Sequence, residues 1–210
     1  MQASFGLCNM LKKTIEQIRK SELVKDNLIL FLGIFFLGVS GFLYHFIVGR
    51  FLGPAEYGNV GALLSIIYIF LIALNTIQMS IAKFTADFTV KKQEGKIKYL
   101  FKRCTRDLAI VAIATALMLI LINRWAAEYL HLRSSLLYIL AIFMPCIFLV
   151  PIVRGILQGR GQFTALSANN AIEGVTKLIV GPLLIVLGLG TEGAIAAILL
   201  AMGIAFLLGF

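Results

Sequence analysis

Six apolar runs of membrane-spanning length lie along the chain, at residues 28–49, 59–82, 108–123, 136–153, 164–187 and 194–210. A helix needs about 20 apolar residues to cross the hydrocarbon core, whereas a barrel strand needs about ten residues of alternating polarity. The six runs are continuous and do not alternate. The pattern therefore predicts an all-α, polytopic membrane protein, a six-helix transmembrane bundle with short loops.

The composition agrees with this class, because 60% of the residues are hydrophobic, 14% are charged and the mean hydropathy is +0.96. Residues 1–27 are too polar for a signal peptide. Within them Leu11, Ile15 and Ile18 recur at helical spacing among basic residues, which predicts an amphipathic helix on the membrane surface.

Lysine and arginine indicate the orientation. Five precede residue 28, eight lie from Lys83 to Arg106, and two are Arg154 and Arg160, whereas the opposite side holds three. Because cytoplasmic loops are enriched in these residues, we expect segment 1–27 and the basic loop 83–107 to lie in the cytoplasm, with the bundle in the cell (cytoplasmic) membrane. The net charge of +9 then faces anionic membrane lipids, and no nucleic-acid partner is expected.

The fifth run carries polar residues at membrane depth. Asn169, Glu173 and Lys177 share one helical face, beside Asn170. An ionisable group there costs about 2.5–3.5 kcal/mol, so it normally faces a bundle interior or a water-filled cavity. One interpretation is an ion pair between Glu173 and Lys177 packed against other helices. The other, favoured because Lys177 lies about 20 Å into its helix, is a polar cavity.

Polar residues of other runs add candidates to this cavity and to its cytoplasmic end. Asn75 and Gln78 either face the cavity or form hydrogen bonds between helices. Lys83 and Asp87 form a second pair of opposite charge four residues apart, which we assign to a cytoplasmic gate. Arg154 is expected to order the cytoplasmic turn.

No pattern indicates catalysis. The sequence has no nucleophile elbow, no phosphate-binding glycine loop and no cluster with metal-ligand spacing, and its three cysteines are not spaced like metal ligands. We therefore expect no catalytic residue, metal or cofactor. His45, near the outer end of the first run, fits a packed interfacial residue better than a proton relay.

Three glycine motifs follow at the expected helix junctions: Gly49–Gly58 (GRFLGPAEYG), Arg154–Gly159 (RGILQG) with Phe163, and Gly188–Gly190 with Gly193 and Ala194. In this order they resemble the polysaccharide-transporter (lipid-linked oligosaccharide flippase) family of the multidrug/oligosaccharidyl-lipid/polysaccharide exporter superfamily. The resemblance covers the chain from about residue 25 onwards.

The resemblance implies two six-helix bundles that rock around a central cavity and carry a lipid-linked glycan across the membrane by alternating access. Arg50 matches the family's outer-loop arginine. With Lys177 it is a candidate to hold the substrate's diphosphate, and its equal alternative is to fix the outer end of the first helix through lipid headgroups or Glu56. Only one bundle is present here, so we expect an N-terminal half or fragment. A second six-helix bundle would come from a continuation of the chain or from a partner.

Two alternatives remain. A multidrug or cation antiporter of the same superfamily often carries a coupling carboxylate in its first helix, whereas residues 28–49 contain no Asp or Glu. Glu173 is either a site for a proton or sodium ion or only a partner for Lys177. A non-transporting scaffold for envelope polysaccharide assembly would recruit other proteins through the basic loop 83–107.

Overall fold

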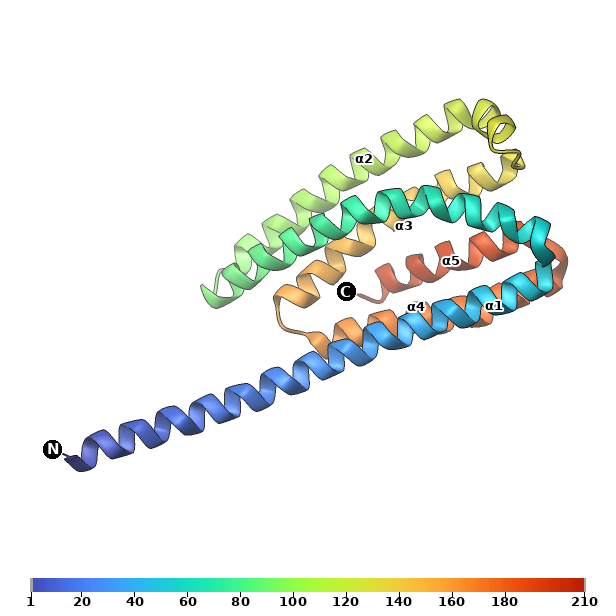
Figure 1. Cartoon of the computed structure of the whole chain (residues 1–210). Helices are drawn as coiled ribbons and strands as arrows, with labels where there is room; N and C mark the ends of the chain where they lie inside the picture. Colours follow the sequence, from blue (N-terminus) through green and yellow to red (C-terminus); the bar gives the residue numbers. More distant parts are fainter. Residues whose placement is uncertain (1, 210) are drawn as a thin grey trace.

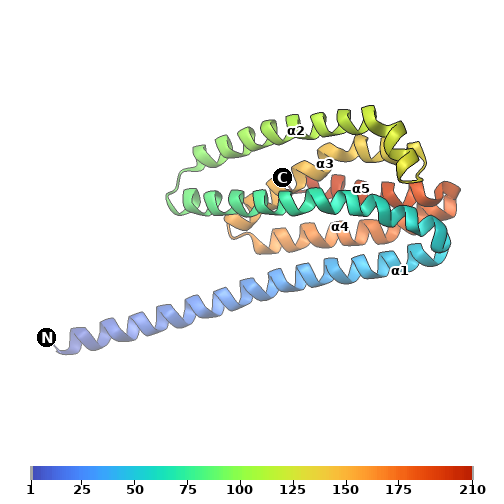
Figure 2. The ribbon, with the colours of Figure 1, turned by 45° about the horizontal axis from the view of Figure 1, so that its top comes forward.

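The computed structural model describes the backbone of residues 2–209 and the side chains of residues 24–209. Its elements are all helical: α1 (Gln2–Val90), α2 (Glu94–Tyr129), α3 (Ser134–Gly159), α4 (Phe163–Leu184), the π-helical turn η1 (Ile185–Leu189) and α5 (Gly190–Leu207). They lie side by side in a bundle, from which the N-terminal part of α1 projects (Figures 1 and 2). The all-α prediction is confirmed.

Four helical spans are long and apolar enough to cross a membrane: Val24–Val90, Glu94–Tyr129, Ser134–Gly159 and Phe163–Leu207. The chain is therefore a multi-pass membrane protein. Six separate helices were predicted, but the first and last spans each contain two of the expected apolar runs. The physical reason is that these runs are joined through one or two glycines within helical backbone instead of through loops.

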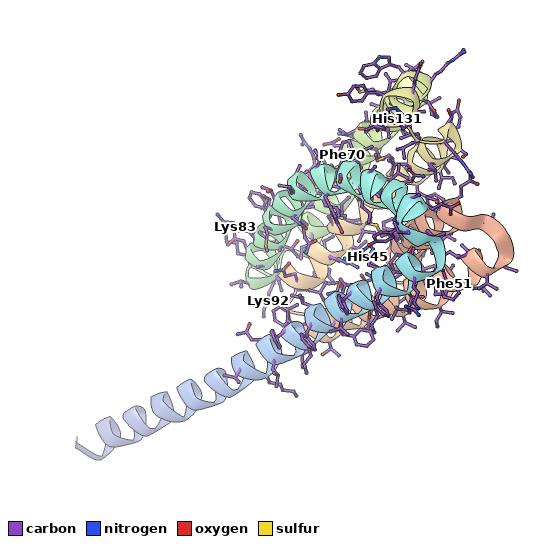
Figure 3. All side chains as sticks on the ribbon, turned by 45° about the vertical axis from the view of Figure 1, so that its right-hand side comes forward. His45, Phe51, Phe70, Lys83, Lys92 and His131 are labelled. Atoms are coloured by element: carbon purple, nitrogen blue, oxygen red, sulfur yellow. The ribbon has the colours of Figure 1, made fainter. Side chains whose placement is uncertain are left out.

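The first of these joints divides α1 into a first arm (residues 2–52) and a second arm (residues 54–90). Gly53 has φ 74° and ψ 172°, a backbone region that is essentially restricted to glycine. Pro54 follows it, with a fixed φ suited to the first turn of a new helix. The chain reverses direction here (Figure 1), and Phe51 marks the bend in Figure 3.

The second joint connects α4 to α5. Gly188 has φ 90° and Gly190 has φ 50°, both in the left-handed range that favours glycine. The last part of the chain thereby returns alongside α4, and α5 also packs against α3. Both glycines belong to the third sequence motif.

The helices extend beyond the apolar runs into charged sequence. The expected loop 83–107 is helical except around residues 91–93, where the second arm of α1 ends and α2 begins. Helices propagate at low cost once nucleated, so polar residues outside the apolar runs continue them. Residues 2–27 likewise continue α1 without a break, whereas their placement on a membrane surface stays a prediction.

The first arm of α1 and α4 meet along what we call the α1–α4 seam, formed by Gly33 with Ser167, Ser40 with Gly174, and Tyr44 with Gly181. A Cβ atom on Gly174 would lie 2.8 Å from Ser40 Oγ, and one on Gly181 would lie 2.5 Å from Tyr44 Cε2. Small residues allow this close approach of helices in a membrane.

A second line of close contact, the α1–α3 seam, joins the second arm of α1 to α3. Cβ atoms on Gly155 and Gly159 would lie 2.8 Å from the carbonyl oxygen of Gln78 and 2.5 Å from that of Ala82. The motif Arg154–Gly159, expected at a loop, is thus part of α3, and its two glycines serve helix packing.

Substitution Gly159→Ala tests the α1–α3 seam. The added methyl group meets backbone that cannot rotate away, so we expect the free energy of unfolding to fall by about 1–3 kcal/mol. Thermal unfolding in detergent, followed by size-exclusion chromatography, measures the change. Gly61→Ala is the matched control, because a Cβ at Gly61 meets nothing within 4 Å. Equal melting temperatures for the two variants would contradict the close packing.

Candidate functional site

Two adjoining cavities that are lined by apolar and polar side chains lie within the bundle. The first, of about 250 Å³, lies between both arms of α1, α3, α4 and α5; we call it the Lys177 chamber. The second, of about 220 Å³, is the Gln78 chamber. Leu37, Asn75 and Arg154 line both. The polar side chains of the Lys177 chamber are Tyr44, His45, Tyr68, Asn75, Arg154, Glu173 and Lys177.

An ion pair lies at the junction of the two chambers. Arg154 Nη2 of α3 donates to Glu173 Oε2 of α4 at 2.5 Å, and Arg154 Nε donates to Asn169 Oδ1 at 3.0 Å. Asn169 Nδ2 in turn donates to the carbonyl oxygen of Ala205 at 2.5 Å, which ties the network to α5. The side chains of Arg154 and Glu173 are only 14% and 12% exposed. Since α3 and α4 otherwise share few contacts, this network is their main polar connection among the described residues.

The position of Arg154 differs from the expected cytoplasmic turn. Its apolar run ends at Val153, but α3 continues to Gly159, so Arg154 lies inside the helix. The sequence spacing does indicate the contact between Arg154 and Asn169. Arg154 precedes the turn glycine Gly161 by seven residues, and Asn169 follows Gly161 by eight. Two antiparallel helices joined by a short turn bring such positions to the same level.

Lys177 forms no ion pair among the described residues. The expected ion pair between Glu173 and Lys177 is not formed, since Glu173 is bound to Arg154. Throughout the part of the chain whose side chains are described, Lys177 has no hydrogen bond and no ion pair. Its Nζ lies near the first arm, 3.6 Å from the position of a Cβ on Gly41. The Lys177 chamber thus holds two cations and one carboxylate.

The other candidates from the sequence divide into two groups. Asn75 lines both chambers, and Gln78, which lines the second, donates to Gln158 Oε1 at 3.3 Å. Arg50 is exposed beside the bend in α1 and lines neither chamber. Lys83 and Asp87 are also exposed, and Asp87 pairs with Lys91 at 2.8 Å instead of with Lys83. Figure 3 shows Lys83 at the end of the second arm opposite the Phe51 bend.

Tyr44 and His45 line the Lys177 chamber, and of the two only His45 was singled out from the sequence, as a packed residue. Tyr44 is 1% exposed and its Oη donates to the carbonyl oxygen of Ala194 at 2.6 Å, linking α1 to α5. His45 packs between the rings of Tyr44 and Tyr57, with centroids 5.3 Å and 6.2 Å away. The Nδ1 atom of His45 is buried without a hydrogen-bond partner. The apolar run 28–49, which contains Tyr44 and His45, gives no signal of the face that they occupy.

The chemistry of the chambers is that of a binding site. Their polar groups are one guanidinium, one ammonium, one imidazole, one carboxylate, amides and hydroxyls, which together can hold a hydrated or anionic group. Among residues 24–209, no three His, Cys, Asp or Glu side chains are placed to hold a metal ion. The excess positive charge favours an anion.

Comparison with known proteins identifies the fold. No protein-family model matches the sequence, and no curated protein matches it. Among solved structures, a MOP superfamily transporter from Pyrococcus furiosus, described as having a binding pocket of reverse polarity that suggests a different function, matches with a TM-score of 0.74 and 19% identity. An outward-facing multidrug resistance MATE family transporter of the MOP superfamily matches with 0.73 and 18% identity, and a mutant MATE protein with 0.74 and 20%.

Each match covers 86% of this chain, but only 41% or 42% of the solved transporter chain. The present chain therefore spans less than half of the length of these proteins. The chain has the same fold as the matched part of these solved transporters.

Proposed function

We propose that this chain forms one bundle of a transporter that moves a lipid-linked oligosaccharide or polysaccharide precursor across the cytoplasmic membrane by alternating access. The observation that carries the proposal is the unpaired cation Lys177 in a chamber inside a membrane-spanning bundle. The headgroup of such a substrate contains a diphosphate that cannot cross hydrocarbon unaided. Cationic donors in a cavity supply the charge-assisted hydrogen bonds that this anion needs.

The fold supports a transporter of two bundles. In this proposal the two arms of α1, together with α2, α3, α4 and α5, are six transmembrane segments, and the lysine and arginine bias places the N-terminus in the cytoplasm. The transporters with the same fold have chains more than twice as long. A second bundle, from a continuation of the chain or from a partner, would close the chambers on their open side.

A multidrug or cation antiporter is the alternative, because a multidrug transporter is among the proteins of this fold. A cationic drug or a coupling ion requires a carboxylate that is free to bind it. In the Lys177 chamber the carboxylate of Glu173 is already bound to Arg154, and residues 28–49 of the first arm contain no Asp or Glu. The charge balance therefore favours an anionic substrate.

A flipping assay tests the proposal. The full-length protein is purified from its host and reconstituted into liposomes with a fluorescent polyprenyl-diphosphate sugar. An impermeant reagent then quenches the fluorescence of the lipid that reaches the outer leaflet. We expect Lys177→Ala to slow flipping at least about tenfold, as expected for loss of a charge-assisted hydrogen bond. The control Lys102→Ala removes an exposed lysine of α2 and should have no effect.

The same assay separates the alternatives. An antiporter would exchange a cationic dye for protons or sodium and would leave the lipid in place. A scaffold would show no flipping, and charge reversal within residues 83–107 would impair glycan assembly in cells while Lys177→Ala would not. Unchanged flipping by Lys177→Ala and by Glu173→Ala would remove the cavity argument.

A further inference from the structure

The ion pair and the unpaired lysine form one unit around Glu173. Arg154 reaches Glu173 from α3, and Lys177 follows Glu173 by four residues on α4. A glutamate that precedes a lysine by four residues is well placed for an ion pair on a helix. Glu173 therefore has two possible cationic partners, of which one is occupied in this structure.

Lys177 and Arg154 differ in the chambers that they line. Lys177 lines only the Lys177 chamber, whereas Arg154 lines both that chamber and the Gln78 chamber, with Gln78, Gln158 and Asn170. Along the axis of α4, Lys177 lies about 6 Å beyond Glu173. A change of partner at Glu173 would thus move the uncompensated positive charge from one chamber to the other.

The surroundings suit such a change. Arg154 is held through Nε by Asn169, so its guanidinium keeps its position when Glu173 leaves Nη2. A guanidinium has five donors, enough to bind Asn169 and an anion at the same time. Lys177 has a flexible stem and no ion pair among the described residues, and its position four residues after Glu173 is within the reach of an ion pair along one helix face.

We propose that Glu173 is a counter-ion shared by two anion-binding cations, Lys177 and Arg154. An anionic headgroup passes from one cation to the other, and Glu173 pairs with the cation that does not hold the headgroup. The inference rests on the proposed function, because it names the two successive positions of the transported diphosphate. At each stage the chambers keep a single uncompensated charge. The anion is held firmly enough to enter and loosely enough to leave.

The test is binding of inorganic pyrophosphate to the purified protein in detergent, measured by isothermal titration calorimetry. Lys177→Ala should weaken binding about 10- to 100-fold, because Glu173 still neutralises Arg154. Adding Glu173→Gln should restore binding to near the original affinity, because Arg154 is then free for the anion. Glu173→Gln alone should tighten binding, since both cations are free.

A matched control distinguishes a shared counter-ion from a change of net charge. Glu128→Gln removes an exposed carboxylate of α2, and in the Lys177→Ala background it should restore nothing. Equal recovery with Glu128→Gln, or no recovery with Glu173→Gln in protein of unchanged circular dichroism, overturns the inference. If Glu173→Gln disturbs folding, Glu173→Ala in the same background replaces it.

The failures of the two proposals differ. If the unmodified protein does not bind pyrophosphate, the cationic chamber and the shared counter-ion fail together. If it binds and Lys177→Ala weakens binding without rescue by loss of Glu173, the anion site stands and only the change of partner is wrong.

Discussion

Removing both cations beside Glu173, with Arg154→Ala and Lys177→Ala in one chain, is expected to lower the free energy of unfolding by about 3–5 kcal/mol. The Glu173 side chain is only 12% exposed, and without either cation its carboxylate is left in the bundle uncompensated. Lys177→Ala alone should cost little, because Arg154 remains bonded to Glu173. Arg154→Ala alone should lower the free energy of unfolding by an intermediate amount, because Lys177 can then pair with the carboxylate of Glu173. Titration with SDS, followed by circular dichroism, measures all three variants.

Two comparisons control this result. Arg160→Ala breaks an ion pair with Glu94 whose side chain is 60% exposed, and it should change the stability by less than about 1 kcal/mol. Adding Glu173→Gln to the double variant should recover most of the lost stability, because burying a neutral amide costs less free energy than burying a carboxylate. A double variant as stable as Arg160→Ala would show that Glu173 does not depend on these cations.

Gly53→Ala is expected to have the second large effect. With φ 74° and ψ 172°, this position costs any residue with a Cβ about 1–3 kcal/mol of strain. Because both arms of α1 line the Lys177 chamber, a shift at the bend should also weaken pyrophosphate binding. Thermal unfolding and calorimetry on the same sample measure the two effects.

The control for the bend is Gly58→Ala, at a glycine of the same motif. A Cβ at Gly58 meets nothing within 4 Å, and Gly58 does not have a positive φ. It should therefore be neutral or slightly stabilising. If both variants behaved alike, the bend would not depend on the backbone freedom of Gly53.

The helices could be predicted from the sequence because apolar length is a strong signal in a membrane protein. Each of the six apolar runs lies largely within helical backbone. How these runs are joined could not be predicted in the same way. A joint at Gly53, or at Gly188 and Gly190, takes one or two residues of unusual φ, and the apolar pattern reports no backbone angles.

The site could be predicted in part for a similar reason. Glu173, Lys177 and Asn169 are recognisable by their depth in an apolar run. Glu173 and Lys177 line the chambers with Asn75 and Gln78, and Asn169 is buried beside them, where it accepts a hydrogen bond from Arg154. The partner of Glu173 was missed because Arg154 was assigned to a cytoplasmic turn and not to the helix that pairs with α4 about the turn at Gly161. Arg50 was included for its motif, but its place at the bend leaves it exposed.

The two seams have a mechanical consequence. The first arm of α1 approaches α4 at Gly174 and Gly181, and the second arm approaches α3 at Gly155 and Gly159, so closely that a Cβ atom at any of these glycines would lie within 3 Å of the neighbouring helix. A motion that preserves both seams must treat each pair of helices as a rigid body. Any turn between the two pairs would bend the chain at Gly53 and strain the bond from Arg154 to Glu173, and α5, which packs against both α3 and α4, would have to follow it.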